Sequence, residues 1–254
     1  MSVIDNKETH RLESLTRNYY NTYISTDITY DNCEIVYTDN IYHDYIHMTD
    51  CQRFFLPGTL GTTYYNKQKS TIFISYQDDI FEDEYYKHTC NTTIHEMIHV
   101  NDYVVFDNNG IDSGYDSPMR KYIVLWSEFH AYYIELLHSQ FLSAYYDQID
   151  PEYYEPQYPD TNDGQLIADI LLGDPNDKVS VMVFMASLEI SIHHQDKMKC
   201  NIERILHKFE TPNLVSSLRQ LHNLLHGLLQ RGEYPGEKEL LEVFDLASYC
   251  GQNL

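Results

Sequence analysis

The stretch T-T-I-H-E-M-I-H-V-N-D-Y, residues 92–103, carries the strongest chemical signal in the chain and anchors the expected fold. His95 and His99 are four residues apart, so on a helix their imidazoles lie on one face, one turn apart. Two neutral imidazoles in this arrangement suit a single Zn2+ ion. Glu96 lies beside the pair, where its carboxylate can take a proton from water at the metal. The pattern predicts a zinc site with Glu96 as general base.

A second histidine pair in the chain shows what the alternative looks like. His222 and His226 are also four residues apart, in L-R-Q-L-H-N-L-L-H-G-L-L, but no Glu follows the first His and the flanks are rich in Leu. We therefore expect this pair to serve helix packing. For residues 95–99, the alternative interpretation is a surface helix that carries an ordinary pair of histidines four residues apart. The predicted order of a strand, the motif helix, a loop and a second helix favours the zinc site.

A catalytic zinc needs a third protein ligand and one open position. Glu128 is the preferred candidate, because a hairpin of two helices would bring its carboxylate opposite the two imidazoles. Asp102 and Asp116 are the alternatives. Asp102 better suits an acceptor for the N–H of a ligand histidine, with a solvated or capping acid as the competing interpretation. Glu135 follows Glu128 by seven residues and is a weaker candidate for the same supporting role.

The group that would stabilise a developing oxyanion is not singled out by the sequence. Zinc hydrolases commonly place a His, Tyr or Arg there. Four residues near the predicted second helix have the right chemistry, but a chain with 24 Tyr makes a nearby Tyr uninformative. These residues are Tyr115, His130, Tyr132 and Tyr133.

On both sides of the motif, the hydrophobic pattern of the sequence predicts an α+β fold with a small sheet followed by helices. Residues 5–23 are expected to be helical, 33–38 and 70–76 to be strands, and 57–63 to be a turn-rich loop. The motif helix is expected over 82–106, a loop over 107–118 and a second helix over 119–146. The Pro-rich stretch 150–164 predicts a linker between a domain over 1–149 and an all-helical region over 165–254. Thr211 and Pro212 together predict a helix start.

Composition narrows the classes of partner. With 17 Lys and Arg against 39 Asp and Glu, the net charge is −22, which disfavours nucleic acid and anionic membrane surfaces and favours a protein or peptide partner. The N-terminal sequence lacks an apolar signal region, and the five Cys are odd in number and widely spaced. We therefore expect a cytoplasmic protein with reduced cysteines. Its oligomeric state is not indicated.

At H-E-M-I-H the sequence resembles the zincin metallopeptidases, and with Glu128 it resembles the gluzincin branch. The helix S-E-F-H-A-Y-Y-I-E-L-L is similar to the E-x-x-A helix of ImmA/IrrE-type peptidases, in which the Glu is the third zinc ligand and Ala131 matches the Ala. T-Y-Y-N-K-Q-K-S-T-I-F-I-S before the motif looks like SprT/Spartan-type proteases. Their third ligand is a His, but here the comparable loop holds Tyr115. These resemblances cover about residues 60–140 and imply a zincin-like metallopeptidase domain acting on intracellular proteins.

The expected function is therefore zinc-dependent hydrolysis of peptide bonds. His95, His99 and Glu128 would bind Zn2+, and Glu96 would be the catalytic base. The alternative is a non-catalytic protein that retains the zincin scaffold for binding, as a regulatory or toxin–antitoxin component. A metal-free helical interaction protein is a third hypothesis.

Overall fold

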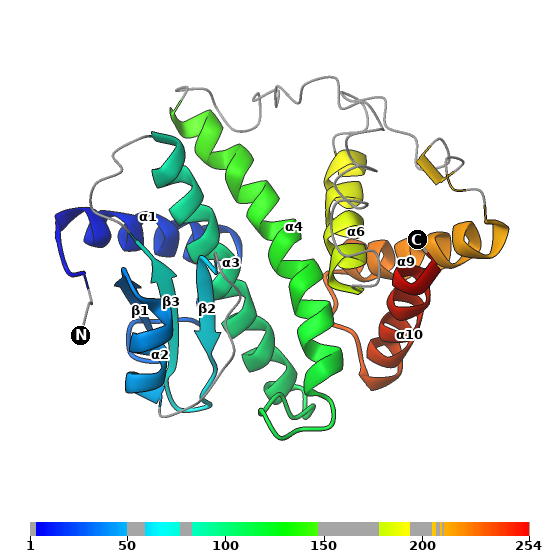
Figure 1. The fold of residues 1–254 in the computed structure, drawn as a ribbon, viewed down its shortest axis with the longest axis horizontal. Helices are drawn as coiled ribbons and strands as arrows, with labels where there is room; N and C mark the ends of the chain where they lie inside the picture. The colour runs from blue at the N-terminus through cyan, green and yellow to red at the C-terminus, as the bar shows by residue number, and fades with distance from the viewer. Residues whose placement is uncertain are drawn as a thin grey trace. The chain divides into compact units, whose positions relative to one another are not determined.

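The computed structural model describes residues 4–49, 59–76, 83–146, 178–193, 205–206, 209 and 211–253. Over these residues the protein has seven helices and a three-stranded mixed sheet (Figure 1), which confirms the α+β expectation at this level. The chain forms two compact units, Met1–Val104 and Val105–Leu254. No helix in the described part of the chain is long and apolar enough to cross a membrane.

The sheet lies in the first unit and has the strand order β1-β3-β2. Its strands are β1 (Cys33–Thr38), β2 (Gly61–Tyr64) and β3 (Ser70–Ser75). β1 runs parallel to β3, with Cys33 opposite Ser70, and β2 runs antiparallel to β3, with Gly61 opposite Ile74. In the central strand, β3, the consecutive residues Ile72, Phe73 and Ile74 are fully buried. This burial on both faces follows from a central strand covered by helices.

Among the described residues, three helices begin in the first unit. α1 (Lys7–Tyr23) has Asn6 as its N-cap. The Asn6 side chain accepts hydrogen bonds from the first-turn N–H groups, and the Asn6 N–H donates to Thr9 Oγ1. This reciprocal cap explains why the helix starts there. α2 (Ile41–Thr49) packs on β2 and β3, with Tyr45 against Phe73. α3 (Asp83–Asn108) carries the histidine motif.

The secondary-structure elements that the structure describes in the second unit are all helices. α4 (Arg120–Tyr146) packs against α6 (Lys178–His193), and α10 (Glu237–Asn253) packs against α4, α6 and α9 (Pro212–Arg231). α9 starts with Thr211 as N-cap and Pro212 in its first turn, which confirms that prediction, although the Thr211 side chain makes no capping hydrogen bond. It ends at Gly232, whose φ of 63° requires a residue tolerant of the left-handed region.

The structure corrects parts of the sequence prediction. The segment 57–63 was expected to be a loop, but Gly61–Tyr64 is strand β2, since its backbone pairs with β3. Helix α2 was not predicted, and α3 extends to Asn108 instead of ending at 106. The predicted linker 150–164 lies outside the described residues, so the boundary proposed there stays a prediction. Among the described cysteines, all are buried free thiols: Cys33, Cys90 and Cys250.

Candidate metal centre

His95 and His99 come together on one face of α3, as the helical spacing predicts. Their Nε2 atoms lie 3.1 Å apart, and the rings meet edge to face with centroids 4.8 Å apart. Two nitrogens bound to one tetrahedral zinc, each at about 2.0–2.1 Å, lie about 3.3 Å apart. The two imidazoles are therefore already spaced as ligands of a single ion.

Aromatic packing holds the His99 ring in this position. His99 is only 6% exposed, and its ring stacks on Tyr103 one turn along α3, with a centroid distance of 6.2 Å and an angle of 11°. Tyr103 in turn meets Tyr65, just after β2, edge to face at 5.2 Å. A ligand whose ring is fixed by its neighbours loses little side-chain entropy when it binds an ion.

Glu96 is held next to the two histidines by strand β2. It is 7% exposed, and the Thr63 hydroxyl donates to its Oε2 over 2.8 Å. Gly61 lets the strand approach closely, because a Cβ at that position would lie 2.8 Å from Glu96 Cγ. The sequence prediction missed both supporting residues. A Thr in a presumed loop gives no local sign that it contacts a helix 33 residues away.

Asp102 is fully buried in the middle of α3, so the interpretation of it as a solvated or capping acid is wrong. Its Oδ1 lies 3.4 Å from Asn101 Nδ2. The Asn101 side chain is itself fixed, because the Tyr20 hydroxyl of α1 donates to its Oδ1 over 2.8 Å. Burial raises the pKa of Tyr20, and the Asp102 charge raises it further. A role for Asp102 as acceptor from a ligand histidine stays a prediction.

The remaining predicted residues belong to the second unit. Glu128 and Glu135 are half-buried on α4, whereas Asp116 is exposed in the loop before it. Tyr115, in the same loop, is 46% exposed and lies under the Arg120 guanidinium. The other three oxyanion candidates are half-buried on α4: His130, Tyr132 and Tyr133. None of these four is distinguished as the oxyanion-stabilising group.

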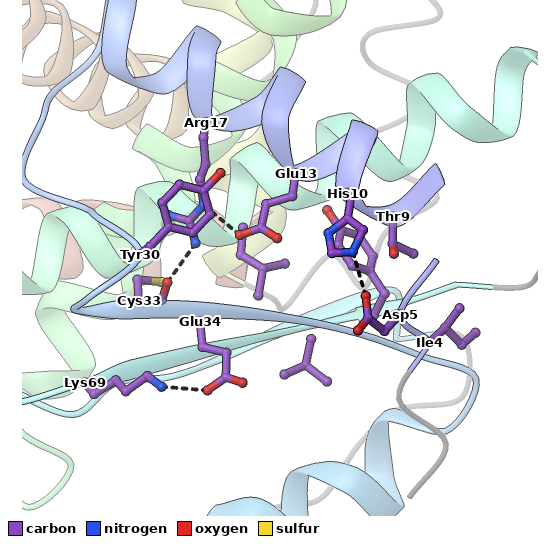
Figure 2. Close-up of a pocket in the computed structure, with 13 residues that line it drawn as sticks. Ile4, Asp5, Thr9, His10, Glu13, Arg17, Tyr30, Cys33, Glu34 and Lys69 are labelled. Carbon is purple, nitrogen blue, oxygen red and sulfur yellow. Dashed lines mark hydrogen bonds and ion pairs between the residues drawn. The ribbon is translucent and has the colours of Figure 1, made fainter. Parts of the chain in front are cut away.

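A surface pocket in the first unit, of about 390 Å³, lies between α1 and β1 (Figure 2), and none of its lining residues belongs to the motif stretch 92–103. The charges that line it pair within it, as the dashed lines show. Arg17 Nε lies 2.8 Å from Glu13, and Lys69 and His10 pair with other carboxylates of the lining. Arg17 also donates to the Cys33 carbonyl over 2.7 Å, which ties α1 to β1. The pocket thus belongs to the packing of α1 on the sheet.

Comparison with known proteins adds no family to this picture. No family model, no curated protein and no solved structure matches the chain.

Proposed function

We propose that the protein is a zinc-dependent metallopeptidase with a zincin-like catalytic domain. One observation carries the proposal. Two imidazole nitrogens converge at 3.1 Å while the carboxylate of the intervening Glu96 is buried and held by Thr63. An ordinary surface histidine pair needs neither the buried acid nor its hydroxyl partner. A general base must be fixed within reach of the water it activates, and Glu96 meets that requirement.

Glu128 is the third ligand in this proposal, and the connection between the two helices supports it. Within the second unit, Phe106 in the last turn of α3 and Trp126 of α4 both pack on Tyr234, with ring centroids 5.5 and 6.3 Å away. His99 lies nine residues before the end of α3, and Glu128 lies eight residues after the start of α4.

At about 1.5 Å of rise per residue, a helical hairpin places two such residues at about the same level, roughly 12–14 Å from the turn. The turn itself is ordered by hydrogen bonds from Ser113 N–H to Asp107 Oδ1 (2.9 Å) and from Arg120 to the Ser113 carbonyl (2.6 Å). In this proposal, His95, His99 and Glu128 would together supply the donor set for one metal ion. Two imidazoles and one carboxylate leave zinc a fourth position open, as catalytic sites require.

The chemistry assigned to the chain follows from this donor set. Zinc bound there would polarise the substrate carbonyl and lower the pKa of water to about 7. Glu96 accepts a proton from the attacking water and passes it to the leaving amine. The net charge of −22 favours neutral or basic peptide segments over acidic ones. We propose a protein or peptide substrate in the cytoplasm, with no role for nucleic acid or a membrane.

The test separates metal binding from catalysis. The wild type, Glu96→Gln and Glu128→Ala are purified alike, and zinc per chain is measured by elemental analysis. Each protein is then incubated with a proteome-derived peptide library, with and without a chelator, and new termini are identified by mass spectrometry. We expect Glu96→Gln to keep its zinc but lose all cleavage, and Glu128→Ala to lose one zinc equivalent. Glu34→Gln is the matched control, because this acid is exposed on strand β1 and pairs with Lys69.

Three outcomes would overturn parts of the proposal. Cleavage that persists in Glu96→Gln would exclude Glu96 as the base. Bound zinc without any cleaved peptide would favour the non-catalytic scaffold. Zinc retained in full by Glu128→Ala would move the third ligand to another acid, of which Asp102 and Asp116 are the sequence-derived alternatives.

A further inference from the structure

The second histidine pair does not only pack its helix. His222 and His226 lie one turn apart on α9, and their rings stack with centroids 5.5 Å apart. Both face Glu189 of α6. Its Oε1 lies 2.9 Å from His222 Nε2, and its Oε2 lies 2.9 Å from His226 Nδ1. One carboxylate therefore bridges two imidazoles across two helices that are distant in sequence.

Burial makes this cluster costly without a ligand. Glu189 is 4% exposed and His222 is 7% exposed. Although Glu189 Oε1 and His222 Nε2 are close, they are not aligned as a hydrogen bond. Within the part of the chain that the structure describes, neither they nor His222 Nδ1 has another hydrogen-bond partner. Burying a carboxylate among polar atoms that lack hydrogen bonds costs free energy, and packing of the surrounding side chains does not offset this cost. The unpartnered atoms thus point to a missing cation.

We propose that Glu189, His222 and His226 form a second divalent-metal site, separate from the motif on α3. One ligand atom from each residue lies within 4.8 Å of the others, and an ion at their centre would satisfy the orphaned buried atoms. Carboxylate and imidazole donors suit zinc and the neighbouring first-row metals. His226 is 36% exposed, which gives the ion a route from solvent and leaves room for a water ligand.

The role of this site differs from that of the motif site. The residue after His222 is Asn223, where the motif has the general base Glu96. Asn223 is exposed and cannot accept a proton from water. The second site is therefore structural, and its ion cross-links α6 to α9 within the second unit. A cation there also neutralises the Glu189 charge, which now raises the pKa of Tyr133 on α4, after the larger effect of burial.

The experiment isolates this site from the first one. The full chain carrying His95→Gln and His99→Gln is titrated with Zn2+ by calorimetry and with Co2+ by visible absorption. We expect one ion per chain and a rise in Tm on adding zinc, because an ion that binds only the folded state stabilises it. Adding Glu189→Gln or His222→Gln should weaken binding at least 100-fold and remove the rise in Tm. Asn223→Ala, on the same helix, should change neither.

The reasoning is refuted if that background binds no zinc, or if Glu189→Gln leaves its affinity unchanged. In that case the cluster is a histidine–carboxylate network that holds two helices without metal. If the background variant does not fold, the wild type decides. Two cobalt ions per chain, falling to one in Glu189→Gln, support the site, and a count unaffected by Glu189→Gln overturns it. No step requires peptide cleavage, so failure of the proposed function would not imitate failure here.

Discussion

Replacing Gly61 by Ala tests the contact between β2 and α3 that holds Glu96. A Cβ at this position would lie 2.8 Å from Glu96 Cγ, 2.8 Å from Thr92 Cγ2 and 2.9 Å from Glu96 Oε1. Carbon atoms in good contact lie about 3.5–4.0 Å apart, so the new methyl overlaps each neighbouring carbon by roughly 0.7 Å or more. Glu96 has little room to yield, because it is buried and Thr63 holds its carboxylate. Overpacking of this kind costs about 1–3 kcal/mol.

Thermal and urea unfolding measure that cost directly. At about 2–4 °C per kcal/mol for a chain of this size, Tm should fall by roughly 2–12 °C. Gly227→Ala is the matched control. Gly227 lies in α9, and its nearest neighbour is the flexible end of Arg231, at 3.2 Å. An alanine in a helix gains about 0.5–1 kcal/mol over glycine, so this variant should be as stable as the wild type or more so. If both variants have wild-type stability, the strand does not approach Glu96 as described.

Two further predictions concern Thr63 and His138. Thr63→Val removes the hydroxyl that donates to Glu96 but keeps the side-chain volume. A hydrogen bond to a charged group is worth about 1.5–3 kcal/mol. Its loss should lower kcat about 10- to 100-fold and leave the zinc content unchanged. Unchanged kcat would show that Thr63 does not position the base. Burial lowers the pKa of His138 to about 3, so below its ordinary pKa of 6.5 the unfolded chain takes up a proton that the folded chain refuses. As the pH is lowered from about 6.5 to 4.5, the free energy of unfolding should therefore decrease by up to about 1.4 kcal/mol per pH unit. His138→Gln should reduce this slope. If urea unfolding gives the same pH dependence for the two proteins, the assignment to His138 is wrong.

The elements that the sequence predicted well are those whose signals are local. C-E-I-V-Y-T and S-T-I-F-I-S are apolar and β-branched runs of strand length, and both are strands. The motif helix and the helix after it carry long apolar patterns on either side of a Gly- and Asp-rich loop. Strand β2 was missed because it follows Pro57 and Gly58 closely and contains Gly61. Its strand conformation depends on pairing with β3, which no local propensity encodes.

The same distinction applies to the candidate site. The approach of His95 to His99 follows from helix geometry, so it could be predicted from five residues of sequence. The residues that contact the two histidine pairs from other elements could not be predicted from local sequence. Thr63 contacts Glu96 from another element, and Glu189 reaches His226 across 37 positions of sequence. For His222 and His226 the Leu-rich flanks correctly indicated a packed helix but gave no sign of the acid they face.

The buried thiols described in the fold make the protein its own reporter of unfolding. Burial raises the pKa of Cys33, Cys90 and Cys250 to about 12 each. At pH 8 only about one such thiol in ten thousand is a thiolate, the form that alkylating reagents attack. Labelling therefore waits for local or global opening. Peptide mapping after timed exposure to iodoacetamide would give a separate labelling rate for each unit, from Cys33 and Cys90 in the first and from Cys250 in the second. Without added dyes or new cysteines, these labelling rates would show whether the two units open together or one at a time.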